Sequence, residues 1–161
     1  MQIEKQQKLI HPDKAYPKAL KYCAYQERSQ QEVRDKLYSW GLHRNEVENI
    51  IVDLISEGYL KEERFAIAFS GGKFRMKKWG KIKIKLALKA KKVSDPLIRK
   101  ALADISEIDY IKTLREVLNK RKKIVKEKNP IKRKYSIASY AIQRGFEPEL
   151  VWEILRSEEE D

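Results

Sequence analysis

Apart from lysine and arginine, the sequence contains few residues whose types and spacing could carry chemistry. It has one cysteine, Cys23, and two histidines, His11 and His43. These three residues cannot fill a four-ligand zinc site, and a single cysteine makes no internal disulfide. Cys23 lies in the apolar stretch 20–25 with no histidine nearby in sequence to activate it. We therefore expect a buried, inert thiol and two surface histidines without a catalytic role.

One segment superficially resembles a phosphate-binding loop. It reads Gly71-Gly72-Lys73-Phe74, but Ile67 occupies the first glycine position of G-x-x-x-x-G-K, and Phe74 replaces the serine or threonine that holds magnesium. The nucleotide, zinc-protease, serine-hydrolase and calcium-loop motifs do not occur either. Neighbouring carboxylates such as Glu62 and Glu63 are interpreted as helix caps and ion-pair partners. We expect no enzymatic activity, no cofactor and no metal.

Lysine and arginine are the main chemical signal, because their charges cluster along the chain. The sequence has 161 residues, with 36 Lys and Arg against 24 Asp and Glu, which gives a net charge of +12. Residues 73–92 hold ten cations and no acid, and residues 120–134 hold nine cations and one acid. Residues 26–63 and 147–161 carry net charges of −4 and −6. Like charges three and four residues apart repel on a helix, so a long run of one sign indicates an anionic partner.

Nucleic acid is the first candidate for that partner, an acidic protein surface the second and a membrane surface the third. The alternative is a lysine-rich face that is merely solvated. Trp79 lies inside the first basic segment, where it either stacks against a partner or packs in the core. The residues expected to contact the partner are cations of the two basic segments, facing each other across a concavity: Lys73, Arg75, Lys77, Lys78, Lys81, Lys83, Lys85, Lys89, Lys120, Arg121, Lys122 and Lys123.

Hydropathy excludes other classes of protein. No run of 18 or more apolar residues occurs, and residues 1–8 have no apolar stretch after their basic residues. We therefore expect neither a membrane span nor a secretory signal, and a cytosolic protein. We also expect a monomer. The charged fraction is 37%, well above the roughly 25% of an average globular protein. An elongated shape, with much surface per residue, accommodates that excess.

A unit of about fifty residues occurs three times in the sequence. Trp40-Gly41-Leu42 aligns with Lys91-Lys92-Val93 and with Arg144-Gly145-Phe146, and apolar residues on both sides match at equal offsets. With a helix-forming composition and room for three helices in each unit, this predicts an all-α protein. The fold is expected to be three tandem three-helix repeats in an elongated, curved array. The predicted divisions are an N-terminal extension (1–14), repeat 1 (15–60), the basic repeat 2 (61–106) and repeat 3 with an acidic tail (107–161).

Local signals place several helix ends. Pro17 is expected to open the first helix, and Ser29 with Glu32 forms a capping box for the second. The pair Gly71-Gly72 is expected to kink or end its helix. The first helix of the third repeat is expected to extend from about residue 108 to residue 128.

Residues 81–88 carry two conflicting signals. Apolar and polar residues alternate there with period two, which is typical of a strand, but the repeat alignment predicts a helix. On a helix, Ile82 and Leu86 lie nearly opposite the core positions Ile84 and Leu88. Either a neighbouring helix of this protein covers this second apolar side or a partner binds it. We expect that a neighbouring helix covers it.

Several motifs together resemble one known family. The sequence has a Glu-Arg-Ser box at 27–33, then Gly58-Tyr59-Leu60 leading to Arg64-Phe65-Ala66, then Gly80-x-x-Lys83-Ile84. The pattern is similar to that of the RecX family of bacterial recombination regulators and covers about residues 16–155. The sequence departs from the family pattern at Lys61 and Glu62, which replace two aspartates, at Lys81, which replaces a proline, and at Ala87, which replaces a glutamate.

The resemblance implies a function. Members of this family are curved arrays of three-helix repeats that bind the RecA recombinase filament on DNA, lie in its groove, and modulate, usually inhibit, strand exchange and ATP hydrolysis without being enzymes. The alternative is a basic helical protein that binds DNA directly without sequence preference. Both hypotheses leave open whether the cations contact RecA or DNA phosphate.

Overall fold

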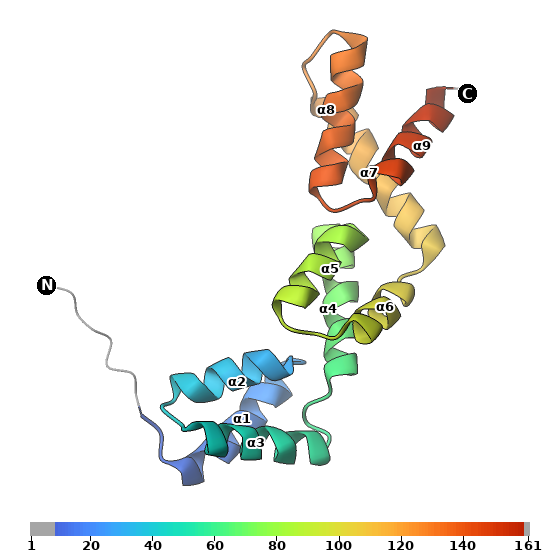
Figure 1. Ribbon diagram of the computed structural model, residues 1–161. Helices are drawn as coiled ribbons and strands as arrows, with labels where there is room; N and C mark the ends of the chain where they lie inside the picture. The colour runs from blue at the N-terminus through green and yellow to red at the C-terminus, as the bar shows by residue number, and fades with distance from the viewer. Residues whose placement is uncertain (1–8, 160–161) are drawn as a thin grey trace, which may run out of the picture.

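A computed structural model describes residues 9–159, and within them the protein consists of nine helices and no strands. The helices form three successive groups in an elongated, bent arrangement (Figure 1). The described chain is thus all-α, as the sequence predicts. In chain order the helices are α1 (Pro12–Tyr25), α2 (Gln30–Ser39), α3 (Arg44–Ser56), α4 (Glu62–Lys77), α5 (Lys81–Ala90), α6 (Asp95–Ala103), α7 (Glu107–Ile124), α8 (Pro130–Gln143) and α9 (Pro148–Glu159).

The helix ends follow from local sequence. The Ser29 hydroxyl accepts a hydrogen bond from the Glu32 amide at 3.0 Å, and the Glu32 carboxylate accepts one from the Ser29 amide at 3.2 Å. This confirms the predicted capping box. The Asn129 side chain accepts from the amides of Ile131 and Lys132 and begins α8 in the same way, with Pro130 in the first turn.

Three predicted helix ends are wrong. Helix α1 begins at Pro12, inside the predicted extension 1–14, so Pro17 lies within the helix and does not begin it. Either proline could stand in a first helical turn, and the sequence does not show which one does. Of that extension, residues 1–8 lie outside the described chain. The pair Gly71-Gly72 is expected to kink or end its helix, and the predicted end is wrong, because α4 continues to Lys77. Helix α7 ends at Ile124, four residues before the predicted end.

Two separate hydrophobic cores hold the array together. One lies within the first repeat and includes Leu37, Leu54 and Leu60. The other extends through both the second and third repeats. At its centre the buried Tyr110 ring lies 5.8 Å from the Phe74 ring and 5.3 Å from the Phe146 ring, measured between centroids. The second and third repeats therefore pack as one body.

Backbone contacts fix the angle between the second and third repeats. The Gly80 amide donates to the Arg144 carbonyl at 2.8 Å, and the Ile82 amide donates to the Gly145 carbonyl at 3.0 Å. The Lys81 amide donates to the Tyr110 hydroxyl at 3.0 Å, so the first amides of α5 are satisfied by the third repeat. A Cβ atom on Gly80 would lie 2.2 Å from the Gly145 carbonyl carbon, so only glycine permits this approach.

The first repeat contacts the second through polar groups. Arg64 pairs with Glu27 at 2.6 Å, and the Glu62 carboxylate accepts from the Gln30 amide at 2.9 Å. Partly exposed contacts of this kind contribute little free energy compared with a shared core. The junction of repeats 1 and 2 is therefore the weaker of the two.

Candidate functional site

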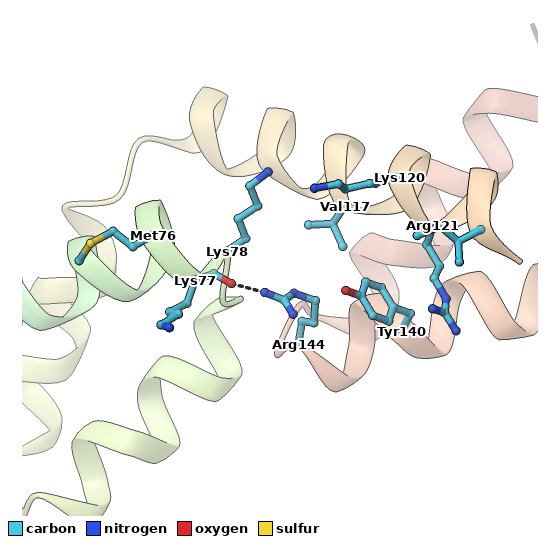
Figure 2. Close-up of a pocket in the computed structure, with 9 residues that line it drawn as sticks. Met76, Lys77, Lys78, Val117, Lys120, Arg121, Tyr140 and Arg144 are labelled. Atoms are coloured by element: carbon cyan, nitrogen blue, oxygen red, sulfur yellow. Dashed lines mark hydrogen bonds between the residues drawn. The ribbon is translucent and has the colours of Figure 1, made fainter.

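A cavity of about 350 Å³ lies between α4, α7 and α8, where the second repeat meets the third (Figure 2). We call it the junction cavity. Its lining contains no carboxylate. Five cations line it: Lys77, Lys78, Lys120, Arg121 and Arg144. The remaining walls are Met76, Val117, Ile124 and Tyr140.

Two arginines and a tyrosine form one side of the junction cavity. Arg144, the residue after α8, donates a hydrogen bond to the carbonyl of Lys77 at the end of α4 (Figure 2). The Tyr140 ring centroid lies 4.7 Å from the Arg121 guanidinium carbon and 5.7 Å from that of Arg144. The Arg121 Nε atom is buried without a hydrogen-bond partner in the described structure. The charge of Arg121 is therefore held against the Tyr140 ring on this side of the cavity.

Lys78 lies at the C-cap of α4 in an unusual backbone conformation. Its φ is 54° and its ψ is 44°, in the left-handed region where glycine is the usual residue. Its ammonium group lies 3.8 Å from the Glu116 carboxylate, a half-exposed pair that contributes little. The charge of Lys78 thus stays accessible to a ligand.

Trp79 packs against the core rather than projecting from the basic segment. It is half-buried beside the shared core of repeats 2 and 3. The ammonium groups of Lys73 and Lys83 lie 5.0 Å and 4.5 Å from its ring centroid. The two lysines are held against the ring by cation–π attraction. Core packing is thus the alternative that the structure supports for Trp79.

The outer face of α5 carries two uncovered aliphatic side chains between lysines. Ile82 is 42% exposed and Leu86 is 63% exposed. The expectation that a neighbouring helix covers them is wrong, because both side chains stay exposed among residues 9–159. Lys85 and Lys89 have the helical spacing that places them on the same face. We call Ile82, Lys85, Leu86 and Lys89 the α5 face.

The other predicted cations do not converge on the cavity. Lys122 pairs with Glu158 of α9, and Lys123 is exposed outside the cavity lining. The Arg75 guanidinium lies against Gly71, where an added Cβ would approach it to 2.7 Å. Lys81 lies over the Tyr110 ring at 4.7 Å. The predicted set is therefore divided among several surfaces.

Sequence reasoning missed Tyr140 and Arg144. Arg144 stands directly before Gly145 in the repeat alignment, at the position held by Trp40 and Lys91 in the other repeats. That alignment marked a helix end but gave no sign that this arginine faces α4.

Three segments of the chain match the three domains of one family. Residues 15–54 match the first RecX three-helix domain, residues 62–102 the second and residues 107–155 the third. Within residues 9–159, no helix combines the length and apolar character needed to cross a bilayer.

Individual relatives agree with this match. A regulatory protein RecX from Thermotoga maritima is 30% identical over 138 residues, covering 85% of this chain and 80% of the relative. A regulatory protein RecX from a Geobacillus strain is 26% identical over 158 residues, and the chain spans 58% of that relative's length. The crystal structure of RecX from Lactobacillus salivarius has a TM-score of 0.81 at 23% identity, covering 91% of this chain and 95% of that one.

Proposed function

The chain belongs to the RecX family, and we propose that it is a non-catalytic regulator that binds the RecA recombinase filament on DNA and mainly inhibits its activity. The observation that carries the proposal is the carboxylate-free group of five cations at the junction of repeats 2 and 3. Such a concentration of positive charge attracts an anionic partner over several ångströms. The name of its relatives, regulatory protein RecX, supports a role that needs no chemistry.

Two surfaces of different character would meet the filament. The junction cavity has the charge that suits a phosphate. The α5 face mixes exposed aliphatic side chains with lysines, which suits an acidic protein surface with apolar pockets. We therefore assign the α5 face to RecA and the junction cavity to DNA. Because repeats 2 and 3 share one core, the two surfaces would stay at a fixed distance and block movement or addition of filament subunits.

The test is ATP turnover by RecA on single-stranded DNA. Adding this protein should lower turnover at substoichiometric ratios, and unchanged turnover at saturating protein would overturn the proposal. Reversing the charges of Lys77, Lys78, Lys81 and Lys85 together should weaken inhibition. The matched control reverses four exposed lysines of α1 and α2, Lys14, Lys18, Lys21 and Lys36, and should inhibit like the parent protein.

The second candidate is a cytosolic monomer that binds DNA by itself, which the carboxylate-free cavity also favours. Gel shifts and pull-downs with RecA alone, DNA alone and the assembled filament separate the two. Direct binding predicts a steep salt dependence, with a log–log slope near −5 for about six neutralised duplex phosphates. A flat salt response, or no binding without RecA, rejects this candidate. Light scattering of the eluted protein checks the monomer.

A further inference from the structure

We propose that the junction cavity is a nucleotide-binding site, in which the cations hold a phosphate and the apolar wall holds the sugar or base. The phosphate belongs either to a free nucleoside phosphate or to a nucleotide unit of single-stranded DNA. The volume of about 350 Å³ is within the range of small-ligand sites. If the phosphate belongs to single-stranded DNA, the inference rests on the proposed function. If it belongs to a free nucleotide, the inference does not. Both cases are tested without RecA.

The ligand must supply negative charge, because five of the nine residues that line the cavity are cations and none carries a carboxylate. The Arg121 guanidinium lines the cavity and lies 4.7 Å from the Tyr140 ring centroid, so its charge is held in place there. Arg144 is already held by the Lys77 carbonyl, which orients its guanidinium beside Tyr140 (Figure 2). A phosphate has several acceptor oxygens and forms charge-assisted hydrogen bonds with such groups.

Lys78 adds an accessible charge at the C-terminal end of α4. Its ammonium group lies 3.8 Å from the half-exposed Glu116 carboxylate, a pair that contributes little and leaves the charge available to a ligand. Its left-handed backbone is shared by Lys92, which does not line the cavity, so the position of the charge, and not the backbone conformation, links Lys78 to the cavity.

The apolar wall indicates more than a bare phosphate. Met76 is 80% exposed and Ile124 is 60% exposed, and both line the cavity together with Val117 and the Tyr140 ring. An inorganic anion would leave this wall in water. A sugar and base next to the phosphate would cover part of this wall.

Two matched pairs of variants test the site. Lys78→Gly and Lys92→Gly each remove one charge and relax one left-handed residue, but only Lys78 lines the cavity. Lys120→Ala and Lys123→Ala each remove one exposed charge from α7, and only Lys120 lines the cavity. Binding is measured by fluorescence anisotropy with two probes, a labelled oligothymidylate and a fluorescent ADP. Thermal unfolding of each variant confirms that it folds.

The cavity variants Lys78→Gly and Lys120→Ala should each weaken binding of at least one probe about tenfold. For the oligonucleotide, each should also reduce the salt slope by about 0.7, the value for one lost phosphate contact on a single strand. Lys92→Gly and Lys123→Ala should bind like the parent protein, and thymidine without phosphate should not compete. A loss with the oligonucleotide alone assigns the site to DNA, and a loss with ADP assigns it to free nucleotides.

Equal losses in cavity and control variants would overturn the proposal, because binding would then follow total charge. Binding of neither probe, or unchanged binding of both by the cavity variants, would also overturn it. Neither result would touch inhibition of RecA through the α5 face, which is measured separately by ATP turnover.

Discussion

Replacing Gly80 with alanine should break the junction between the second and third repeats. The φ of Gly80 is −76°, which alanine adopts freely, so the backbone conformation itself costs nothing. The added Cβ atom, however, would lie 2.2 Å from both the Gly145 carbonyl carbon and the Phe146 nitrogen. Both are backbone atoms that cannot rotate away, so the two repeats must separate.

The expected cost is about 3 kcal/mol of unfolding free energy. Overpacking contributes about 2 kcal/mol. Separation also weakens the Gly80–Arg144 and Ile82–Gly145 hydrogen bonds, each worth about 1 kcal/mol. The lower entropy of alanine in the unfolded chain returns about 0.7 kcal/mol. Because repeats 2 and 3 share a core, they should lose this stability together.

Urea unfolding followed by circular dichroism measures the loss. The matched control is Gly72→Ala in α4, where the added Cβ would meet only the flexible end of Met76 at 3.4 Å. Alanine is a better helix former than glycine, so the control should gain up to about 1 kcal/mol. A Gly80→Ala protein as stable as the parent would refute the account of the junction.

Two further predictions concern the two junctions. Tyr110→Phe removes the hydroxyl that accepts from the Lys81 amide and donates to Glu147. The free energy of unfolding should therefore fall by about 2 kcal/mol at neutral pH, and an unchanged urea midpoint would contradict this. Burial and Glu147 raise the pKa of Tyr110, so the unfolded state ionises first above about pH 10. The parent protein should therefore lose up to about 1.4 kcal/mol per pH unit there from this group, a component that the variant lacks. At the weaker junction, Glu62→Ala removes the acceptor of the Gln30 amide and should speed tryptic cleavage after Lys61. Glu63→Ala, whose carboxylate pairs with Lys100 inside the second repeat, is the control, and equal cleavage rates would argue against a polar hinge.

The repeat architecture could be predicted because it depends on local patterns. In each repeat, two apolar residues precede the aligned segment at the same spacing, as Val33 and Leu37 do in the first repeat and Ile84 and Leu88 in the second. All of them are buried in the structure. Helix periodicity places such residues on one face whatever the neighbouring repeat does. The same local character explains why Pro17 misled the prediction. A proline in the second turn of a helix and a proline that begins one look alike when only the flanking residues are considered.

The candidate site could be predicted only in part. Four of the twelve expected cations, Lys77, Lys78, Lys120 and Arg121, line the junction cavity. Some of the others are held by partners distant in sequence, as Lys122 is by Glu158 and Lys81 is by Tyr110, and the rest lie on other faces of their helices. The expectation that a neighbouring helix buries Ile82 and Leu86 was wrong because no sequence pattern indicates which helix packs beside α5.

The helices, their threefold repetition and the concentration of positive charge in the middle of the chain follow from sequence patterns alone. Which charges share a cavity depends on how distant segments pack. That packing depends on the angle between repeats 2 and 3, which the Gly80–Gly145 contact and the buried Tyr110 set across sixty-odd residues of chain. Arg144 faces Lys77 for this reason, although nothing near either residue in sequence indicates it.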